Sequence, residues 1–370
     1  MQAILVTRFD ALQTIAAELY QQPILGVDTE SNSLHAYRER VCLIQFSTLD
    51  QDYLIDPLAL QDLSPLAPVF SNPQSEKIFH AAEYDVLCMK RDFGFVFANL
   101  FDTMMAARIL GIREVGLGSL LQNEFGITLD KRYQRANWGQ RPLPEELLEY
   151  ARQDTHHLIP LRDRLYEQLN SKDLLDLAAE DFERVGALDG RATFAEPESS
   201  IQFNGAHDLT PQQLAVLQEL CGYRDRAAYD MDRPLFKVIG NDTLIAIAKS
   251  CPAKFEDLRH IPGMTNGQLH RHGRSLLSAV QRGLQAKPIQ PLRPPRPDGH
   301  YLARLDALRQ WRKSTAIQWQ VESDVVLPRE VMVAIAEQNP MTHEQLSGAM
   351  ACTPWRFEHF GSQILAALKD

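Results

Sequence analysis

The sequence has few of the features that mark membrane, secreted or zinc-stabilised proteins. No stretch approaches the roughly 18 consecutive apolar residues that a membrane-spanning helix needs. The first residues, MQAILVTRFD, lack the basic segment and apolar core of a signal peptide. The five cysteines are scattered and never spaced CxxC, which disfavours a zinc ribbon or a disulfide framework. We therefore expect a soluble, cytoplasmic protein with reduced thiols and no membrane association.

The composition indicates a folded protein of two or three domains. The chain has 370 residues, of which 45% are hydrophobic and 23% charged. A net charge of −10 is unusual for a protein that binds nucleic acid, but the charge is uneven. Residues 201–300 hold 13 Lys and Arg against 9 Asp and Glu, a surplus of four positive charges. On this tally a basic face for phosphates and a solvated surface of mixed charge are equally open.

The first 170 residues alternate between short apolar runs and helical patterns. Strands are predicted at 24–28, 41–47 and 53–56, with another beginning at residue 77. Helices are predicted at 81–91, 103–110, 119–125 and, as the longest, 145–169. This order predicts a mixed sheet flanked by helices.

The rest of the chain contains two similar segments, each preceded by a connecting segment. The connectors are a polar segment at 190–208 and a proline-rich segment at 287–299. An ungapped offset of 88 residues pairs Tyr223-Arg224 with Trp311-Arg312, and Pro252 with Pro340. Because apolar residues recur at helical spacing in both copies, we predict two helical bundles of the same fold.

Two acidic residues end the first clear strand. Asp28 and Glu30 are two positions apart, so their side chains point to one face of the strand. Neighbouring carboxylates repel each other unless a cation neutralises them, and a hard divalent cation is their natural partner. By itself, the DTE segment is equally compatible with a turn or a helix N-cap.

Three further acidic residues stand at helical positions. Tyr150 and Asp154 are four apart and share one helix face, although an exposed Asp and a half-buried Tyr would give the same spacing. Asp85 follows an apolar strand and a small-residue turn, where a first-turn carboxylate is also common. For Asp102 we favour a structural role, as the cap of a helix that begins at Thr103.

Taken together, the segments ILGVDTE, FHAAEYDVL and YARQDTHHL resemble the three motifs of the DEDD superfamily of 3′-to-5′ exonucleases, in the branch with a YxxxD third motif. The segments FDTMMAARILG and GLGSLL are similar to the ribonuclease D family, and the two repeats resemble HRDC domains. The resemblance implies an α/β exonuclease domain with an RNase H-like mixed sheet flanked by helices, plus two all-α HRDC bundles. The implied divisions are the exonuclease domain at 1–170, a helical extension and linker at 171–208, HRDC bundles at 209–284 and 301–370, and a proline-rich linker at 285–300.

The resemblance also implies a chemistry. Asp28, Glu30, Asp85 and Asp154 would hold two divalent cations, Mg²⁺ or Mn²⁺, for hydrolysis that releases 5′-mononucleotides. We expect Tyr150 to orient the attacking water rather than to deprotonate it, because an unperturbed phenol has a pKa near 10. The implied partners are RNAs, namely tRNA precursors and small structured RNAs, and the implied state is a monomer.

Contacts with the 3′-terminal nucleotide are expected from residues near the motifs: Thr29, His80, Leu34 and Tyr84. Leu34 and Tyr84 are better explained as core residues, whereas His80 is as readily explained as a buried histidine with a hydrogen-bond partner. Trp138 suits either a stacking surface or a buried loop anchor.

Two other functions fit the same motifs. One is a 3′-to-5′ exonuclease that acts on DNA, and the other is a non-catalytic RNA-binding scaffold, although no motif carboxylate is missing. Basic residues in the first repeat are expected to form an RNA-binding face: Arg224, Lys237, Lys249, Lys254, Arg259, Arg271 and Arg274. Acidic residues make the second repeat less suited to phosphates, so we expect it to serve packing or to shape the funnel to the active site: Glu322, Asp324, Glu330, Glu337 and Glu344.

Overall fold

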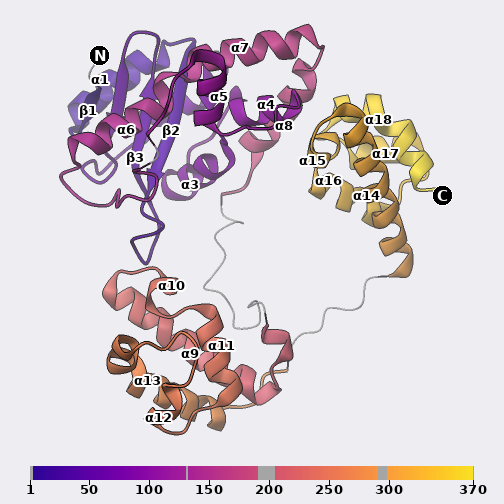
Figure 1. Cartoon of the computed structure of the whole chain (residues 1–370). Coiled ribbons are helices and arrows are strands. Elements are labelled where there is room, and N and C mark those ends of the chain that lie inside the picture. The colour runs from indigo at the N-terminus through magenta and orange to yellow at the C-terminus, as the bar shows by residue number, and fades with distance from the viewer. Residues whose placement is uncertain (1–2, 131, 191–204, 291–297, 370) are drawn as a thin grey trace. The chain divides into compact units, whose positions relative to one another are not determined.

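The computed structural model describes residues 3–130, 132–190, 205–290 and 298–369 (Figure 1). The chain divides into two units. The first comprises residues 1–30, 41–190 and 296–370, and the second comprises 31–40 and 191–295. In the second unit Tyr37 donates a hydrogen bond to Asp225 at 2.6 Å. Among the described helices, none combines the length and the apolar character needed to cross a membrane.

A six-stranded sheet forms the centre of the first unit. Its strands are β1 (Ile4–Val6), β2 (Ile24–Ser31), β3 (Val41–Ser47), β4 (Asp52–Ile55), β5 (Glu76–Phe79) and β6 (Leu100–Asp102). They lie in the order β1-β4-β3-β2-β5-β6. Strands β3 and β4 are antiparallel, whereas β1 pairs with β4, and β5 with β2 and β6, in parallel. The predicted mixed sheet is confirmed.

The four predicted strands are present, and two more were not predicted. Strands β1 and β6 have three residues each, which is too short for alternation to stand out from the surrounding chain. Strand β3 is buried at every position, which matches its apolar sequence VCLIQFS. In the strand order β2 and β3 are the two central strands, and β2 carries Asp28 and Glu30.

Helices surround the sheet. They are α1 (Phe9–Tyr20), α2 (Ala67–Ser71), α3 (Glu83–Phe93), α4 (Thr103–Ile109), α5 (Leu117–Phe125), α6 (Glu145–His156), α7 (Leu158–Ser171) and α8 (Leu175–Ala187). The single helix predicted over 145–169 is wrong, because the chain breaks at His157 (φ −106°, ψ 6°). Pro160 explains the break: it has no N–H, and its ring clashes with the carbonyl four residues earlier, at His156.

The two repeats form two helical bundles, as predicted (Figure 1). The first contains α9 (Pro211–Met231), α10 (Leu235–Val238), α11 (Asn241–Ser250), α12 (Phe255–Leu258) and α13 (Asn266–Gln285). The second contains α14 (Gly299–Trp319), α15 (Ser323–Val326), α16 (Arg329–Gln338), α17 (His343–Ala349) and α18 (Pro354–Ala367). Helices α14, α15 and α16 begin and end 88 residues after α9, α10 and α11.

One arginine makes the same internal contact in each repeat. Arg224 Nη1 donates to the Ile239 carbonyl at 3.0 Å, and Arg312 Nη1 donates to the Leu327 carbonyl at 2.9 Å. Both pairs are also related by the 88-residue offset. Three helices and this arginine contact thus recur at the same offset, which supports a duplicated fold.

Within the first unit, the second bundle is joined to α8 by a buried ion-pair cluster. The Arg356 side chain has no exposed surface and donates to Glu180 at 2.7 Å and to Asp181 at 2.8 Å. Arg184 pairs with Glu330, and Arg108 pairs with Glu322 and Asp324 at 2.5 Å each. Three of the five acidic residues named for this repeat, Glu322, Asp324 and Glu330, therefore pair with arginines of α4 and α8.

Candidate active site

Three acidic side chains from two distant segments converge at the centre of the sheet. Asp28 and Glu30 lie on β2, and Asp154 lies on α6. Each offers a carboxylate oxygen within 4.8 Å of those of the other two. The strand spacing of two and the helix spacing of four therefore bring the predicted residues of the first and third motifs together.

Asp85 is buried in the first turn of α3 and is not among the three residues whose oxygens meet within 4.8 Å, but its charge raises the pKa of Asp28 and of Glu30. It accepts a hydrogen bond from the Thr29 hydroxyl, which lies between the two acidic residues of β2. Asp102 fixes the preceding turn, because its carboxylate accepts from the Ala81 and Ala82 amides at 3.1 and 2.8 Å. Asp102 also caps α4 by accepting from Met104 N, so its predicted structural role is confirmed.

Burial and mutual repulsion raise the pKa values of these carboxyl groups. For Asp28 and Glu30 the pKa lies well above the ordinary value, first because of burial and then because of the neighbouring acidic groups. Burial also raises the pKa of Asp85 and that of Asp154 to about 7. Four such groups cannot all ionise together at neutral pH without a compensating positive charge.

The donor set fits a hard divalent cation. Two oxygen ligands of one Mg²⁺ or Ca²⁺ ion are at most twice the metal–oxygen distance apart, roughly 4–5 Å. The carboxylate oxygens of Asp28, Glu30 and Asp154 lie within 4.8 Å of one another, so small rotations of these side chains bring them to the spacing of ligands around one ion. All donors are carboxylate oxygens, with no cysteine or histidine among them, which favours Mg²⁺ or Mn²⁺ over zinc.

Tyr150 lies on the same face of α6 as Asp154, and the two side chains interact electrostatically. Burial and the three nearby carboxylates raise the pKa of Tyr150 above its ordinary value, so the phenol retains its proton. The Tyr150 ring is 6.1 Å from Trp138 and 6.0 Å from Tyr133. Because Trp138 is only 1% exposed, it is a buried loop anchor rather than a stacking surface.

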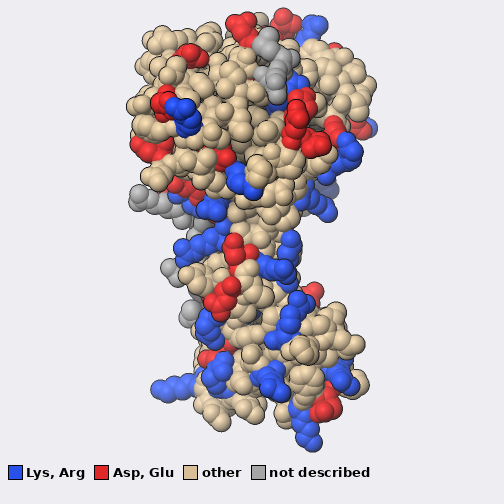
Figure 2. Space-filling view, turned by 90° about the vertical axis from the view of Figure 1, so that its left-hand side faces the viewer, with Lys and Arg blue, Asp and Glu red and all other residues tan. Residues whose placement is uncertain are grey.

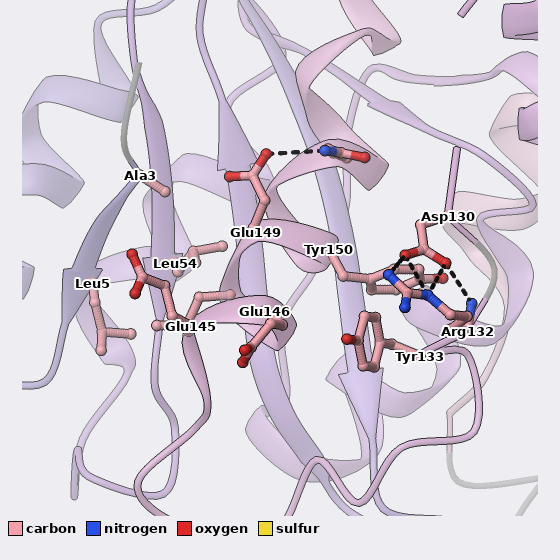
Figure 3. Close-up of a pocket in the computed structure, with 12 residues that line it drawn as sticks. Ala3, Leu5, Leu54, Asp130, Arg132, Tyr133, Glu145, Glu146, Glu149 and Tyr150 are labelled. Carbon is pink, nitrogen blue, oxygen red and sulfur yellow. Dashed lines mark hydrogen bonds and ion pairs between the residues drawn. The ribbon is translucent and has the colours of Figure 1, made fainter. Parts of the chain in front are cut away.

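A pocket of about 440 Å³ opens beside Tyr150. Figure 3 shows Tyr133 next to Tyr150, with the Asp130–Arg132 ion pair at the same side of the pocket. Glu145, Glu146 and Glu149 of α6 also line it. This acidic lining repels phosphate groups, so the pocket lacks the positive charge of a groove that binds the sugar-phosphate backbone of RNA.

Sequence reasoning missed one residue that contacts the acidic group. Gln45 on β3 is fully buried, and its side-chain amide donates to Asp28 Oδ2 at 3.3 Å. The available signal was a single polar residue inside the apolar strand VCLIQFS. A buried amide in such a strand needs a polar partner, but the sequence alone does not say which.

The four residues expected to contact the 3′ end differ in their burial and in their neighbours. Thr29 is beside Asp85, as described above, and the half-buried His80 ring lies 2.9 Å from the Thr103 hydroxyl. Leu34 and Tyr84 are 39% and 48% exposed, so neither is a core residue. Leu34 belongs to the segment 31–40 of the second unit.

The basic residues of the first bundle are spread over its surface. Figure 2 shows Lys and Arg side chains scattered over the lower bundle among fewer acidic ones. Arg224 is not among the exposed residues: it is 2% exposed and donates to Ile239 and Asn241, so its expected place on the RNA-binding face is wrong. A structural arginine and a binding arginine look the same in a sequence. The other six residues named for this face are exposed.

Comparisons with known proteins agree with this arrangement. A 3′-5′ exonuclease family model matches residues 3–170, and an HRDC domain model matches residues 213–280 and 302–368. Ribonuclease D of Gluconacetobacter diazotrophicus is 31% identical over 281 residues, which cover 75% of this chain and 71% of that protein. The chain belongs to the ribonuclease D family.

The ribonuclease D family accounts for both parts of the architecture. The crystal structure of Escherichia coli RNase D has a TM-score of 0.73 at 24% identity and covers 100% of this chain and 99% of that one, which supports the fold. Residues 3–170 therefore form a domain of the 3′-5′ exonuclease family, which depends on divalent metal. Other relatives are longer. RRP6-like 2 of Arabidopsis thaliana is 33% identical over 287 residues, which cover 74% of this chain and 33% of that protein. The chain spans only a third to a half of the length of the first plant and insect relatives that it matches.

Proposed function

We propose that this chain is a divalent-cation-dependent 3′-to-5′ exoribonuclease that releases 5′-mononucleotides from the 3′ ends of RNA. One observation carries the proposal: Asp28, Glu30 and Asp154 meet within 4.8 Å in a chain of the ribonuclease D family. Asp85 is electrostatically linked to the first two, since its charge raises the pKa of each. The proposal extends to tRNA precursors and small structured RNAs as substrates, and to a monomer acting in the cytoplasm.

Each site residue has a separate task in this reaction. Asp28, Glu30, Asp85 and Asp154 would hold Mg²⁺ or Mn²⁺, two ions by the family resemblance. Bound divalent cations supply charge relief at the scissile phosphate and a more acidic attacking water. Tyr150 retains its proton and shares one face of α6 with Asp154, which suits its hydroxyl to orient the water.

The residues around the site suggest how the 3′ end is held. Thr29 is committed to Asp85 through its hydroxyl, so its backbone is the part left for a terminal nucleotide. Tyr84 is exposed at the start of α3, one residue before Asp85, where a ring can stack on a base. Exposed lysines and arginines of the first bundle would add contacts to phosphates.

A digestion assay with the full chain tests this function. A 5′-labelled tRNA precursor with a 3′ extension is incubated with Mg²⁺, with Mn²⁺ or with EDTA, beside a DNA strand of the same sequence. We expect stepwise shortening from the 3′ end with either cation, 5′-mononucleotides as products, and no reaction in EDTA or with Asp28→Ala. Asp10→Ala is the matched control, since Asp10 is an exposed carboxylate on α1.

The outcomes separate the three candidate functions. Faster digestion of the DNA strand would favour a DNA exonuclease. Binding of the RNA without digestion under either cation would favour a scaffold. An Asp28→Ala protein as active as the wild type would remove the acidic group from the mechanism.

A further inference from the structure

A buried carboxylate outside the acidic group holds the helix that carries Tyr150 and Asp154. Asp52, the first residue of β4, has a side chain only 3% exposed. Its carboxylate accepts from the Ser47 hydroxyl at 2.6 Å and from Arg152 Nη1 at 3.2 Å, and it lies 2.9 Å from His156 Nδ1. One carboxylate thus joins β3, β4 and α6.

The two contacts with α6 lie on the face opposite the proposed catalytic residues. Each residue of an α-helix turns the chain by about 100°. Tyr150 and Asp154 form one stripe, and Arg152 and His156 form a second stripe about 200° away. Arg152 lies two residues before Asp154, and His156 lies two residues after it. Their contacts with Asp52 therefore fix the rotation of α6 about its axis.

The end of α6 also lies directly against β2. A Cβ at Gly26 would be only 2.9 Å from the Thr155 carbonyl oxygen, which is too close for a side chain. The Thr155 hydroxyl is 2.7 Å from Ser47, itself the donor to Asp52. A shift of α6 would therefore disturb β2 two residues before Asp28.

Arg152 does not need Asp52 to neutralise its charge. It also donates to the exposed Glu149 carboxylate at 2.6 Å, three residues earlier on the same helix. The ion pair between Arg152 and Asp52 therefore does more than neutralise charge, because it also holds the Arg152 side chain in one place. A buried carboxylate with three converging donors gives a fixed direction to each of them.

We propose that Asp52 is a positioning residue that holds α6 so that Asp154 and Tyr150 face Asp28 and Glu30. The proposal rests on the function proposed above for these four residues. Asp52 contacts none of the reacting groups, and its effect is transmitted through Arg152, His156 and Ser47. Partners that orient metal ligands typically contribute about 10- to 100-fold to metal affinity or activity.

The test is Asp52→Asn in the full chain, which keeps the side-chain volume and removes the charge. We expect Mn²⁺ affinity, measured by isothermal titration calorimetry without RNA, to fall about 10- to 100-fold. We expect kcat on a short RNA to fall by a similar factor, with KM unchanged. Glu76→Gln is the matched control, because it removes the Glu76–Arg162 ion pair (2.6 Å), which anchors α7 instead of α6.

Unchanged Mn²⁺ affinity and kcat in a folded Asp52→Asn protein would overturn the proposal. If that variant does not fold, Arg152→Gln with His156→Gln removes the same clamp from the more exposed side and is expected to give the same losses. A double variant with Tyr150→Phe adds a further check, because residues that act together give non-additive losses. If the wild type digests no RNA, the proposed function fails, whereas the Mn²⁺ titration still tests the role of Asp52.

Discussion

Asp28 and Asp154 bring carboxylate oxygens within 4.8 Å of each other, although they lie on different elements and are far apart in the sequence. Such proximity costs free energy unless a cation or a proton intervenes. The site is therefore built for its ligand at the expense of the stability of the metal-free protein.

Replacing Asp28 by Asn separates these two effects. We expect Asp28→Asn to lose more activity than the roughly 100-fold typical of residues behind the metal ligands. The same change removes a repelling charge, so the metal-free variant is expected to melt at a higher temperature than the wild type. Thermal unfolding in EDTA and RNA digestion in Mg²⁺ measure the two quantities. A metal-free Asp28→Asn protein less stable than the wild type would contradict the repulsion argument.

The stability of the metal-free protein is expected to fall as the pH rises. The folded protein raises the pKa of Asp85 and of Asp154 to about 7 from an ordinary value of 3.8, so it binds more protons than the unfolded chain between those values. Their contribution is present below about pH 4 and is lost as the pH approaches 7.

Mg²⁺ is expected to reverse that loss. Since bound cations replace the protons, the rise in melting temperature caused by Mg²⁺ is expected to increase from pH 5 to pH 8; at 100 times the Kd, a ligand stabilises by about 2.7 kcal/mol. Melting curves in EDTA and in Mg²⁺ across this pH range test it, with Asp28→Asn as the control that has a weaker dependence. An Mg²⁺ effect that is constant with pH would contradict the assignment.

Tyr150→Phe tests orientation of the attacking water. Loss of the hydroxyl leaves the ring packed against Trp138 and Tyr133, so folding is expected to be unchanged. We expect kcat to fall by about 100-fold, a typical cost of misplacing a reacting group, with little change in KM. Single-turnover digestion at saturating enzyme measures the chemical step. A Tyr150→Phe enzyme with the wild-type rate would rule out this role.

Arg356 is expected to be essential to the stability of the first unit. Arg356→Met leaves Glu180 and Asp181 buried with less compensating charge, which typically costs about 3–5 kcal/mol. Urea unfolding measures the loss. Arg309→Met is the control, because its pair with Asp306 is exposed and such pairs contribute about 0–1 kcal/mol. Equal stabilities of the two variants would show that the buried cluster contributes no more than a surface pair.

The exposed basic residues of the first bundle are expected to bind RNA through phosphates. Changing Lys254, Arg259, Arg271 and Arg274 to Gln should weaken RNA affinity and reduce the slope of log affinity against log salt by about 0.7 per lost contact. Fluorescence anisotropy over a salt series measures both, with Arg309→Gln and Lys313→Gln in the second bundle as the control. Salt-dependent affinity that survives deletion of 209–284 would place RNA binding elsewhere.

The sequence by itself determined the features that depend on local periodicity. A spacing of two on a strand put Asp28 and Glu30 together, and a spacing of four on a helix put Tyr150 beside Asp154. The offset of 88 residues predicted two helical bundles of the same fold. These patterns are legible because backbone geometry fixes the direction of each side chain from its position in the element.

Only the tertiary structure decided which distant residues meet. The contacts of Asp85 with Thr29, of Gln45 with Asp28, of Asp52 with α6 and of Arg356 with Glu180 join residues on separate elements. The same holds for Arg224, whose burial no local pattern indicated. Such contacts depend on how elements pack, and packing is set by many side chains at once rather than by the spacing of any two.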